Sequence, residues 1–242
     1  MTQTFSHPYY IADVFAGTPF QGVPIAVFPH ADAIPEAMLP VIARELNLSQ
    51  TVFILGEEVP DSFHLRAFTP QGESEFVGHP ILAAARGLAA AGKIAPGENN
   101  QTLTFVGGQG NGGTTATVNY AAPAGKPLFV QFTLRSQAVI DRYTPTDAEL
   151  AALLSLSPSD IHTHIFHTRL VSTGLPYLMV PLASQAAVRK ARFNAEAWSR
   201  SSAPAMAAQE LFLFSNRTAT RDADFHARIL GVGVGAKEDP PI

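Results

Sequence analysis

The chain has 242 residues, a formal net charge of −4 and no cysteine. Its composition, 46% hydrophobic and 15% charged, is typical of a globular chain long enough for one large or two small domains. The lack of cysteine excludes disulfides, cysteine metal sites and cysteine nucleophiles. We expect a cytoplasmic protein without nucleic-acid or membrane partners, because no broad cationic surface, signal peptide pattern or spanning apolar run is present.

The first half of the chain predicts short strands and two helices. Pro35 is placed for the first turn of a helix whose apolar residues recur at helical spacing as far as Leu48. The sequence Gly78-His79-Pro80 begins an alanine-rich helix over 81–91, which ends at Gly92. The remaining apolar or alternating runs predict strands, and they cover residues 11–15, 25–28, 51–55, 63–68, 102–106 and 114–120.

A glycine-rich segment, Gly108 to Gly113, matches the G-x-G-x-x-G pattern of dinucleotide sites. Such a site needs a helix directly after the glycines, because the helix N-terminus holds the pyrophosphate. Residues 114–118 have the composition of a strand instead. The segment is therefore interpreted as the loop of a hairpin rather than as a nucleotide site.

The best candidate for a domain boundary is the small, proline-containing segment 121–127. It divides the chain into an N-terminal domain of residues 1–122 and a C-terminal domain of residues 127–242. In the second domain, Thr146 and Glu149 form a capping-box pattern ahead of a helix over 147–154, and Asn194 is expected to cap another helix. A further helix is predicted over 184–191, and strands over 129–134, 165–172, 177–181, 210–214 and 225–230.

Three histidines, His162, His164 and His167, lie close together in the second domain. On a strand, His162 and His164 would share one face and could bind a metal ion, as in a metal hydrolase. His167 would then point to the opposite face, and Asp160 is the only acidic residue close by in the sequence, so a complete set of metal ligands is not expected. We therefore expect no metal site, and the hydrolase is the weakest of three functional hypotheses.

Two places in the first domain have the residue types of an acid–base site. Glu45 can be an ordinary solvated helix carboxylate, but its position between Ile42 and Leu46 favours a partly buried setting, which suits a base that removes a proton from carbon. His79 can simply cap its helix. Alternatively, it stands where a helix N-terminus attracts an anion such as a substrate carboxylate, and Gly78 allows close approach to the backbone.

The segment from Ala67 to Ala85 resembles the PhzF-like (phenazine biosynthesis-like) family, which shares the diaminopimelate epimerase fold. The resemblance extends, in order, over nearly the whole chain. The further matching segments are 13–28, 45–53, 172–177, 223–228 and 238–240.

This resemblance implies an α+β fold with two similar diaminopimelate-epimerase-like domains, each a curled mixed or antiparallel β-barrel around a central helix, with the active site between them. It also implies a cofactor-free and metal-free isomerase, which moves a proton and a double bond on a small carboxylate-bearing substrate. Glu45 would be the proton shuttle. His79 and Asp239 would complete the catalytic set and orient the polar groups of the substrate, and the backbone amide of Gly78 would help to bind the carboxylate. Family habit makes a homodimer plausible.

Three features qualify the resemblance. Racemases and epimerases of this fold use two cysteines, so the lack of cysteine excludes stereoinversion by that mechanism and leaves a single shuttling carboxylate. Val23 occupies the place of a family asparagine and cannot supply its hydrogen bonds. The sequence given stops just after Pro240, where the family continues through Gly-Ser and a further helix. The second domain is therefore expected to be incomplete, and a non-catalytic protein that binds small acids on the same scaffold is the alternative function.

Overall fold

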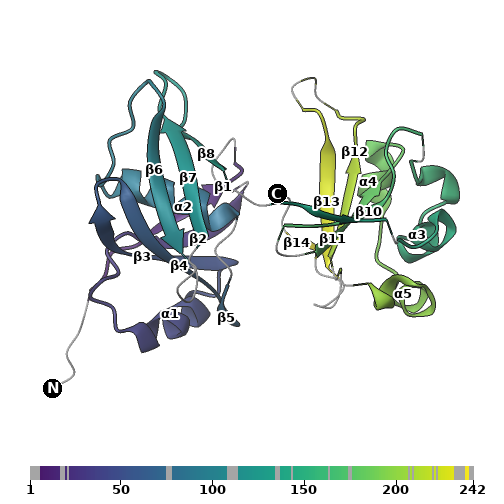
Figure 1. Cartoon of the computed structure of the whole chain (residues 1–242), viewed down its shortest axis with the longest axis horizontal. Coiled ribbons are helices and arrows are strands. Elements are labelled where there is room, and N and C mark those ends of the chain that lie inside the picture. Colours follow the sequence, from purple (N-terminus) through teal and green to yellow (C-terminus); the bar gives the residue numbers. More distant parts are fainter. Residues whose placement is uncertain are drawn as a thin grey trace. The chain divides into compact units, whose positions relative to one another are not determined.

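The computed structural model describes residues 6–16, 20, 22–74, 78–107, 114–133, 137–142, 144–162, 164–173, 176–206, 208, 210–219, 221, 223–231 and 238–239. Contacts divide the chain into two compact units, Met1–Arg135 and Ser136–Ile242 (Figure 1). Among the helices of these described segments, none is both long and apolar enough to cross a membrane.

The first unit is built on one mixed, eight-stranded sheet. Its strand order is β1-β2-β3-β4-β6-β7-β8, and β5 pairs with β4. The pairs β2–β3 and β4–β6 are parallel and the others are antiparallel. The strands are β1 (Tyr10–Val14), β2 (Val23–Phe28), β3 (Gln50–Val59), β4 (Ser62–Thr69), β5 (Gly72–Glu73), β6 (Gln101–Gly107), β7 (Thr114–Ala121) and β8 (Phe129–Thr133).

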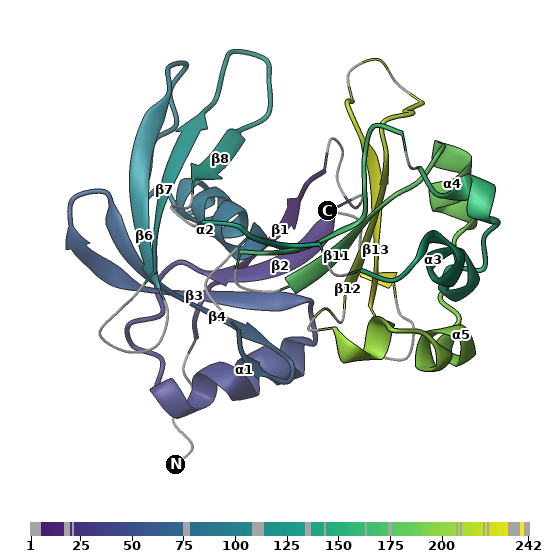
Figure 2. The same ribbon diagram turned by 45° about the vertical axis from the view of Figure 1, so that its right-hand side comes forward.

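Each parallel pair needs a crossover connection, and each crossover of this unit contains a helix. The helix α2 (His79–Ala90) connects β4 to β6, and α1 (Leu39–Leu46), preceded by the 3₁₀ turn η1 (Glu36–Met38), connects β2 to β3. Figure 2 shows α2 inside the curve of the sheet and α1 outside it. The sheet curls around α2 so far that this helix contacts both edge strands, β1 and β8.

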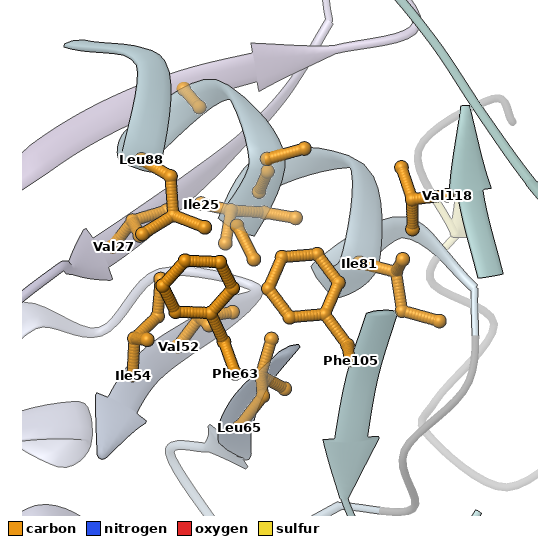
Figure 3. Packing of buried hydrophobic residues seen from close by; sticks show 14 of the residues in the cluster. Ile25, Val27, Val52, Ile54, Phe63, Leu65, Ile81, Leu88, Phe105 and Val118 are labelled. Atoms are coloured by element: carbon orange, nitrogen blue, oxygen red, sulfur yellow. The ribbon is translucent and has the colours of Figure 1, made fainter. Parts of the chain in front are cut away.

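The main core of the unit forms between α2 and the concave face of the sheet (Figure 3). Ile81 and Leu88 of α2 are fully buried against strand residues such as Ile25 and Phe105. The helix approaches β2 so closely that a Cβ atom on Gly87 would lie 2.4 Å from a methyl carbon of Val27. The alanines of α2 and this glycine therefore allow the sheet to wrap tightly around the helix.

A second, smaller core lies under α1 on the other face of the sheet. Leu39 and Ala43 are buried there against Phe53 of β3 and Phe68 of β4. The two faces alternate along each strand, since Leu65 belongs to the core around α2 while Phe68 belongs to the core under α1. The unit thus has an inner helix that is largely buried and an outer helix that is buried along one side.

The second unit contains a six-stranded sheet of order β14-β13-β12-β11-β10-β9, in which only the pair β11–β12 is parallel among the described strands. Its strands are β9 (Val139–Asp141), β10 (Arg169–Ser172), β11 (Pro176–Pro181), β12 (Glu210–Ser215), β13 (His226–Gly231) and β14 (Glu238–Asp239). Its helices are α3 (Asp147–Leu153), η2 (Pro158–Asp160), α4 (Gln185–Lys190), α5 (Ala195–Arg200) and η3 (Ala203–Ala205).

Helices α3, α4 and α5 lie on one side of this second sheet (Figure 2). They share one core with Leu178 of β11 and with Leu211 and Leu213 of β12. Because side chains alternate along a strand, Met179 and Phe212 lie on the opposite face, where the register pairs them directly. Strands β11 and β12 therefore contribute one set of side chains to the helix-covered core and another to the other face.

The predicted helix caps are confirmed. The Thr146 hydroxyl accepts a hydrogen bond from the backbone N–H of Glu149 at 3.3 Å, and the Glu149 carboxylate accepts one from the N–H of Thr146 at 2.8 Å. The same carboxylate also accepts the N–H of Ser202 at 2.9 Å. The side chain of Asn194 caps α5 through the N–H of Ala197 at 3.1 Å.

The α+β class with a curled sheet is confirmed, and so is the antiparallel pairing of the strands on either side of Gly108–Gly113, a loop that itself lies outside the described residues. The strand over 129–134 was expected to begin the second domain, but β8 pairs with β7 and belongs to the first unit. Residues 165–168 are not part of a strand, since β10 begins at Arg169. Three short strands, β5, β9 and β14, were not predicted.

We expect Gly87→Ala to destabilise the first unit, because the new methyl group would overlap Val27 in a closely packed core. The cost should be about 1–3 kcal/mol in the free energy of unfolding, measured by urea denaturation with circular dichroism. Gly97→Ala is the matched control, since its Cβ would meet only the side chain of Gln101, at 3.8 Å. Equal stability of the two variants would show that the close approach of α2 to β2 is absent.

We expect Glu149→Ala to destabilise the second unit by about 1 kcal/mol at pH 7. The N–H groups of Thr146 and Ser202 stabilise the carboxylate and lower the pKa of Glu149 below its ordinary value of 4.5. This stabilisation is therefore complete above pH 4.5 and is lost as the pH falls through the lowered pKa. The single tryptophan, Trp198, lies in the core of this unit and provides the fluorescence signal for urea denaturation.

The control for Glu149 is Glu196→Gln, which removes a carboxylate from an exposed ion pair with Arg200 in the same unit. It should change the stability by less than about 1 kcal/mol. A Glu149→Ala deficit that keeps its full size at pH 3 would contradict the proposed link between this carboxylate and the helix cap.

Candidate functional site

Glu45 lies one residue before the end of α1, the outer helix of the first unit. The helix ends there because Asn47 adopts a left-handed conformation (φ 51°, ψ 34°) and its N–H reaches the carbonyl of Ala43. The buried side of α1 carries Leu39 and Ala43, whereas Glu45 is exposed. The partly buried setting expected for Glu45 is therefore wrong, because the neighbouring apolar residues face the sheet and the carboxylate faces away from it.

Gly78 and His79 form the start of the inner helix. Gly78 is the N-cap of α2 with φ 80° and ψ −136°, a conformation that residues with a side chain rarely adopt. His79 is the first helical residue and is half-buried, and Pro80 occupies the second position. The first turn contains no acidic residue, so the positive end of the helix dipole is not offset by a carboxylate within that turn.

The register of β3 with β4 brings the two segments to the same end of the sheet. Glu45 comes five residues before Gln50, where β3 begins, and the next residue, Thr51, pairs with Phe68 near the end of β4. The chain then turns back through β5, and the N–H of Ser74 bonds to the carbonyl of Ala67 at 2.9 Å. Gly78 follows four residues later, so both candidate segments are attached to this end.

An arginine that was not predicted as a site residue joins the turn before α1 to the strand β5. Arg66 of β4 forms two hydrogen bonds with the carboxylate of Glu73, at 2.7 and 2.8 Å, and a third with Glu36 at 2.6 Å. Its guanidinium also lies over the ring of Phe68, 5.2 Å from the centroid. The bidentate hydrogen bonds with Glu73 are the main cause that raises the pKa of Arg66. One charged group thus connects the turn before α1 with the hairpin that precedes α2.

Asp239 belongs to the second unit. It lies in β14, where its backbone pairs with Ile229 of β13; its side chain is outside the described part of the structure. The joint action of Asp239 with Glu45 and His79 therefore stays a prediction.

The three histidines lie in the loop before β10. Within the described segments, no group of three histidine or acidic residues has the geometry to hold a metal ion. The condition for a shared face is not met, because His162 and His164 do not lie on a strand, and their ring centroids are 6.3 Å apart. The metal-hydrolase hypothesis therefore has no group of ligands in the described residues to support it.

The valine that stands at position 23, in place of the family asparagine, is a buried core residue. Val23 begins β2, is 4% exposed and belongs to the core around α2. It pairs with Val14 of β1. Valine at this position therefore contributes packing rather than a polar contact.

We expect Gly78→Ala to destabilise the first unit although nothing lies within 4 Å of the added Cβ. The cost comes from the backbone conformation alone and should be about 1–3 kcal/mol. Urea denaturation against Gly97→Ala, which has no such conformation, measures it. A Gly78→Ala chain as stable as this control would show that the turn before α2 does not need glycine.

Known proteins resemble this chain over most of its length. The sequence model of the family described as "Phenazine biosynthesis-like protein" matches residues 12–241. An uncharacterized isomerase from Mesorhizobium japonicum is 30% identical over 238 residues, which cover 96% of this chain and 75% of the relative. The trans-2,3-dihydro-3-hydroxyanthranilate isomerase of Pseudomonas fluorescens is 34% identical over 181 residues, but these cover 70% of this chain and 58% of that enzyme. Both names confirm isomerase as the expected enzyme class.

The fold is shared with solved structures. A PhzF-family phenazine biosynthesis protein of Bacillus anthracis matches with a TM-score of 0.80 at 21% identity, over 96% of this chain and 74% of that one. A probable proline racemase of Agrobacterium radiobacter matches with a TM-score of 0.53 at 11% identity, over 91% of this chain and 70% of that one. The fold is therefore of the epimerase-like type. Since the family model spans almost all of its residues, the chain belongs to the phenazine biosynthesis-like (PhzC-PhzF) family.

Proposed function

We propose that this chain is a cofactor-independent isomerase that moves a proton, and with it a double bond, on a small carboxylate-bearing substrate. The observation that carries the proposal is the attachment of Glu45 and of the segment Gly78-His79 to the same end of the β3–β4 pair, in a chain whose relatives are named isomerases.

Glu45 would remove a proton from a carbon atom of the substrate and return it to another. Glu45 is exposed, which supports this role, because a side chain that contacts a substrate must not be covered by its own sheet. A single carboxylate can shuttle a proton between two positions on one face of a molecule. A thiol pair is not available, since the chain has no cysteine.

The start of α2 would bind the carboxylate of the substrate. The helix has 12 residues, so its N-terminus attracts an anion, and the open space beside Gly78 leaves the backbone approachable. His79 would orient a polar group of the substrate. Asp239 would complete the catalytic and substrate-binding set from the second unit, whose sheet we propose to be a second epimerase-like domain related to the first.

The candidate substrate comes from the relative named for trans-2,3-dihydro-3-hydroxyanthranilate. An anthranilate carries the carboxylate that the proposed site requires. A homodimer would accord with the family, and we propose no metal or organic cofactor for the reaction.

The test is exchange of deuterium from heavy water into trans-2,3-dihydro-3-hydroxyanthranilate, followed by proton NMR. We expect Glu45→Gln to lower the exchange rate by a factor of about 10²–10⁴, since general acid–base groups contribute that much. Glu98→Gln, an exposed carboxylate of a loop in the same unit, is the matched control and should exchange at the rate of the unaltered chain.

Undiminished exchange by Glu45→Gln would show that another group moves the proton. Binding of the substrate with no exchange by the unaltered chain would favour the alternative, a protein that binds small acids without turnover.

A further inference from the structure

The second unit contains a polar pocket that the proposed isomerase reaction does not use. Its volume is about 440 Å³, within the range of sites for small molecules. It is lined by Thr144, Asp147, His162, His167, Thr168 and Arg169.

The topology of the sheet assembles this pocket from three segments. Leu170 of β10 pairs with Asp141, the last residue of β9, so the residues before β10 lie beside the connection from β9 to α3. The N–H of His162 bonds to the carbonyl of Pro181 at the end of β11, the strand next to β10. Backbone pairing within this unit therefore brings the pocket residues together.

Arg169 supplies a positive charge that no acidic group among the described residues pairs with. Its guanidinium donates one hydrogen bond, to the carbonyl of Thr168 at 2.7 Å. Arg169 forms no ion pair within the described residues, although Asp147 lines the same pocket. Arginine has five N–H donors, so several remain to bind an anion.

His162 adds a buried polar atom that lacks a partner. Its Nδ1 is inaccessible to solvent and has no hydrogen bond to the protein in the described part of the chain. The ring is held from one side by Phe166, with centroids 5.7 Å apart. This nitrogen is closed off from the pocket, so His162 would contact a ligand through the accessible part of its ring, which is half-buried.

The set of donors indicates the kind of ligand. An arginine, two histidines and two threonine hydroxyls can together donate more hydrogen bonds than the two oxygens of a carboxylate usually accept, whereas a phosphate group presents three strong acceptor oxygens. Asp147 would repel a bare phosphate, but it would accept a hydrogen bond from a hydroxyl group on the same molecule.

The pocket is separate from the position of Asp239. The backbone register runs from Asp239 through Ile229, Phe212 and Met179 to Arg169, one residue on each of five neighbouring strands. Four strand spacings of about 4.8 Å separate the two ends by about 19 Å. A ligand at Arg169 would thus lie well away from Asp239 on this sheet.

We propose that this pocket binds a small phosphate monoester that carries a hydroxyl group, with the phosphate at Arg169, His162 and His167 and the hydroxyl toward Asp147.

The experiment is a titration of the full ¹⁵N-labelled chain with glycerol 3-phosphate, followed by amide NMR shifts. We expect saturable shifts at Thr144, His167 and Thr168, which sodium chloride at equal ionic strength does not produce. Arg169→Gln should weaken binding about tenfold or more, because it removes a charge-assisted contact. Arg86→Ala, which removes an exposed cation of the first unit, is the matched control and should leave the affinity unchanged.

His167→Ala alters an exposed residue and keeps the test valid if Arg169→Gln does not fold; it should weaken binding several-fold. Shifts that do not saturate, or an affinity that neither variant lowers, would overturn the proposal. Inorganic phosphate that binds as tightly as glycerol 3-phosphate would overturn the role of the hydroxyl and of Asp147.

Discussion

The first unit depends on the burial of α2 within its own sheet. A helix buried on most sides cannot carry many polar residues, and the alanines and Gly87 of α2 make it thin enough for β2 to pack directly on it. Because the strands at both edges of the sheet reach this helix, the sheet must curl. The N-terminus of α2, with its half-buried His79, lies at the edge of this core, and the proposed anion site lies there.

The same arrangement explains where Glu45 lies. The inner face of the sheet is filled by α2, so the second crossover helix, α1, packs on the outer face and buries only one side. A carboxylate on the other side of α1 is accessible, whatever its apolar neighbours suggest. Arg66 joins the turn before this outer helix to β5, which precedes α2, through its bonds with Glu36 and Glu73.

Features that depend on neighbours in the chain were predictable from the sequence, and features that depend on distant partners were not. The cap formed by Thr146 and Glu149 involves residues three positions apart and was predicted correctly. The exposure of Glu45 depends on which side of α1 meets the sheet, and the Arg66 ion pairs join positions 30 and 7 residues away. Likewise, β8 follows a proline-containing segment typical of a boundary, yet its hydrogen bonds with β7 place it in the first unit.

The fold of this chain does not determine its reaction. It shares its fold with a probable proline racemase at 11% identity, a likeness that reflects the strand and helix arrangement and carries no residue of a site. These 242 residues contain no cysteine and so supply no thiol pair. The accessible carboxylate of Glu45 and the glycine conformation before His79 are compatible with proton transfer on an acid. In the proposed function, these local features, more than the sheet that positions them, decide which reaction the chain would perform.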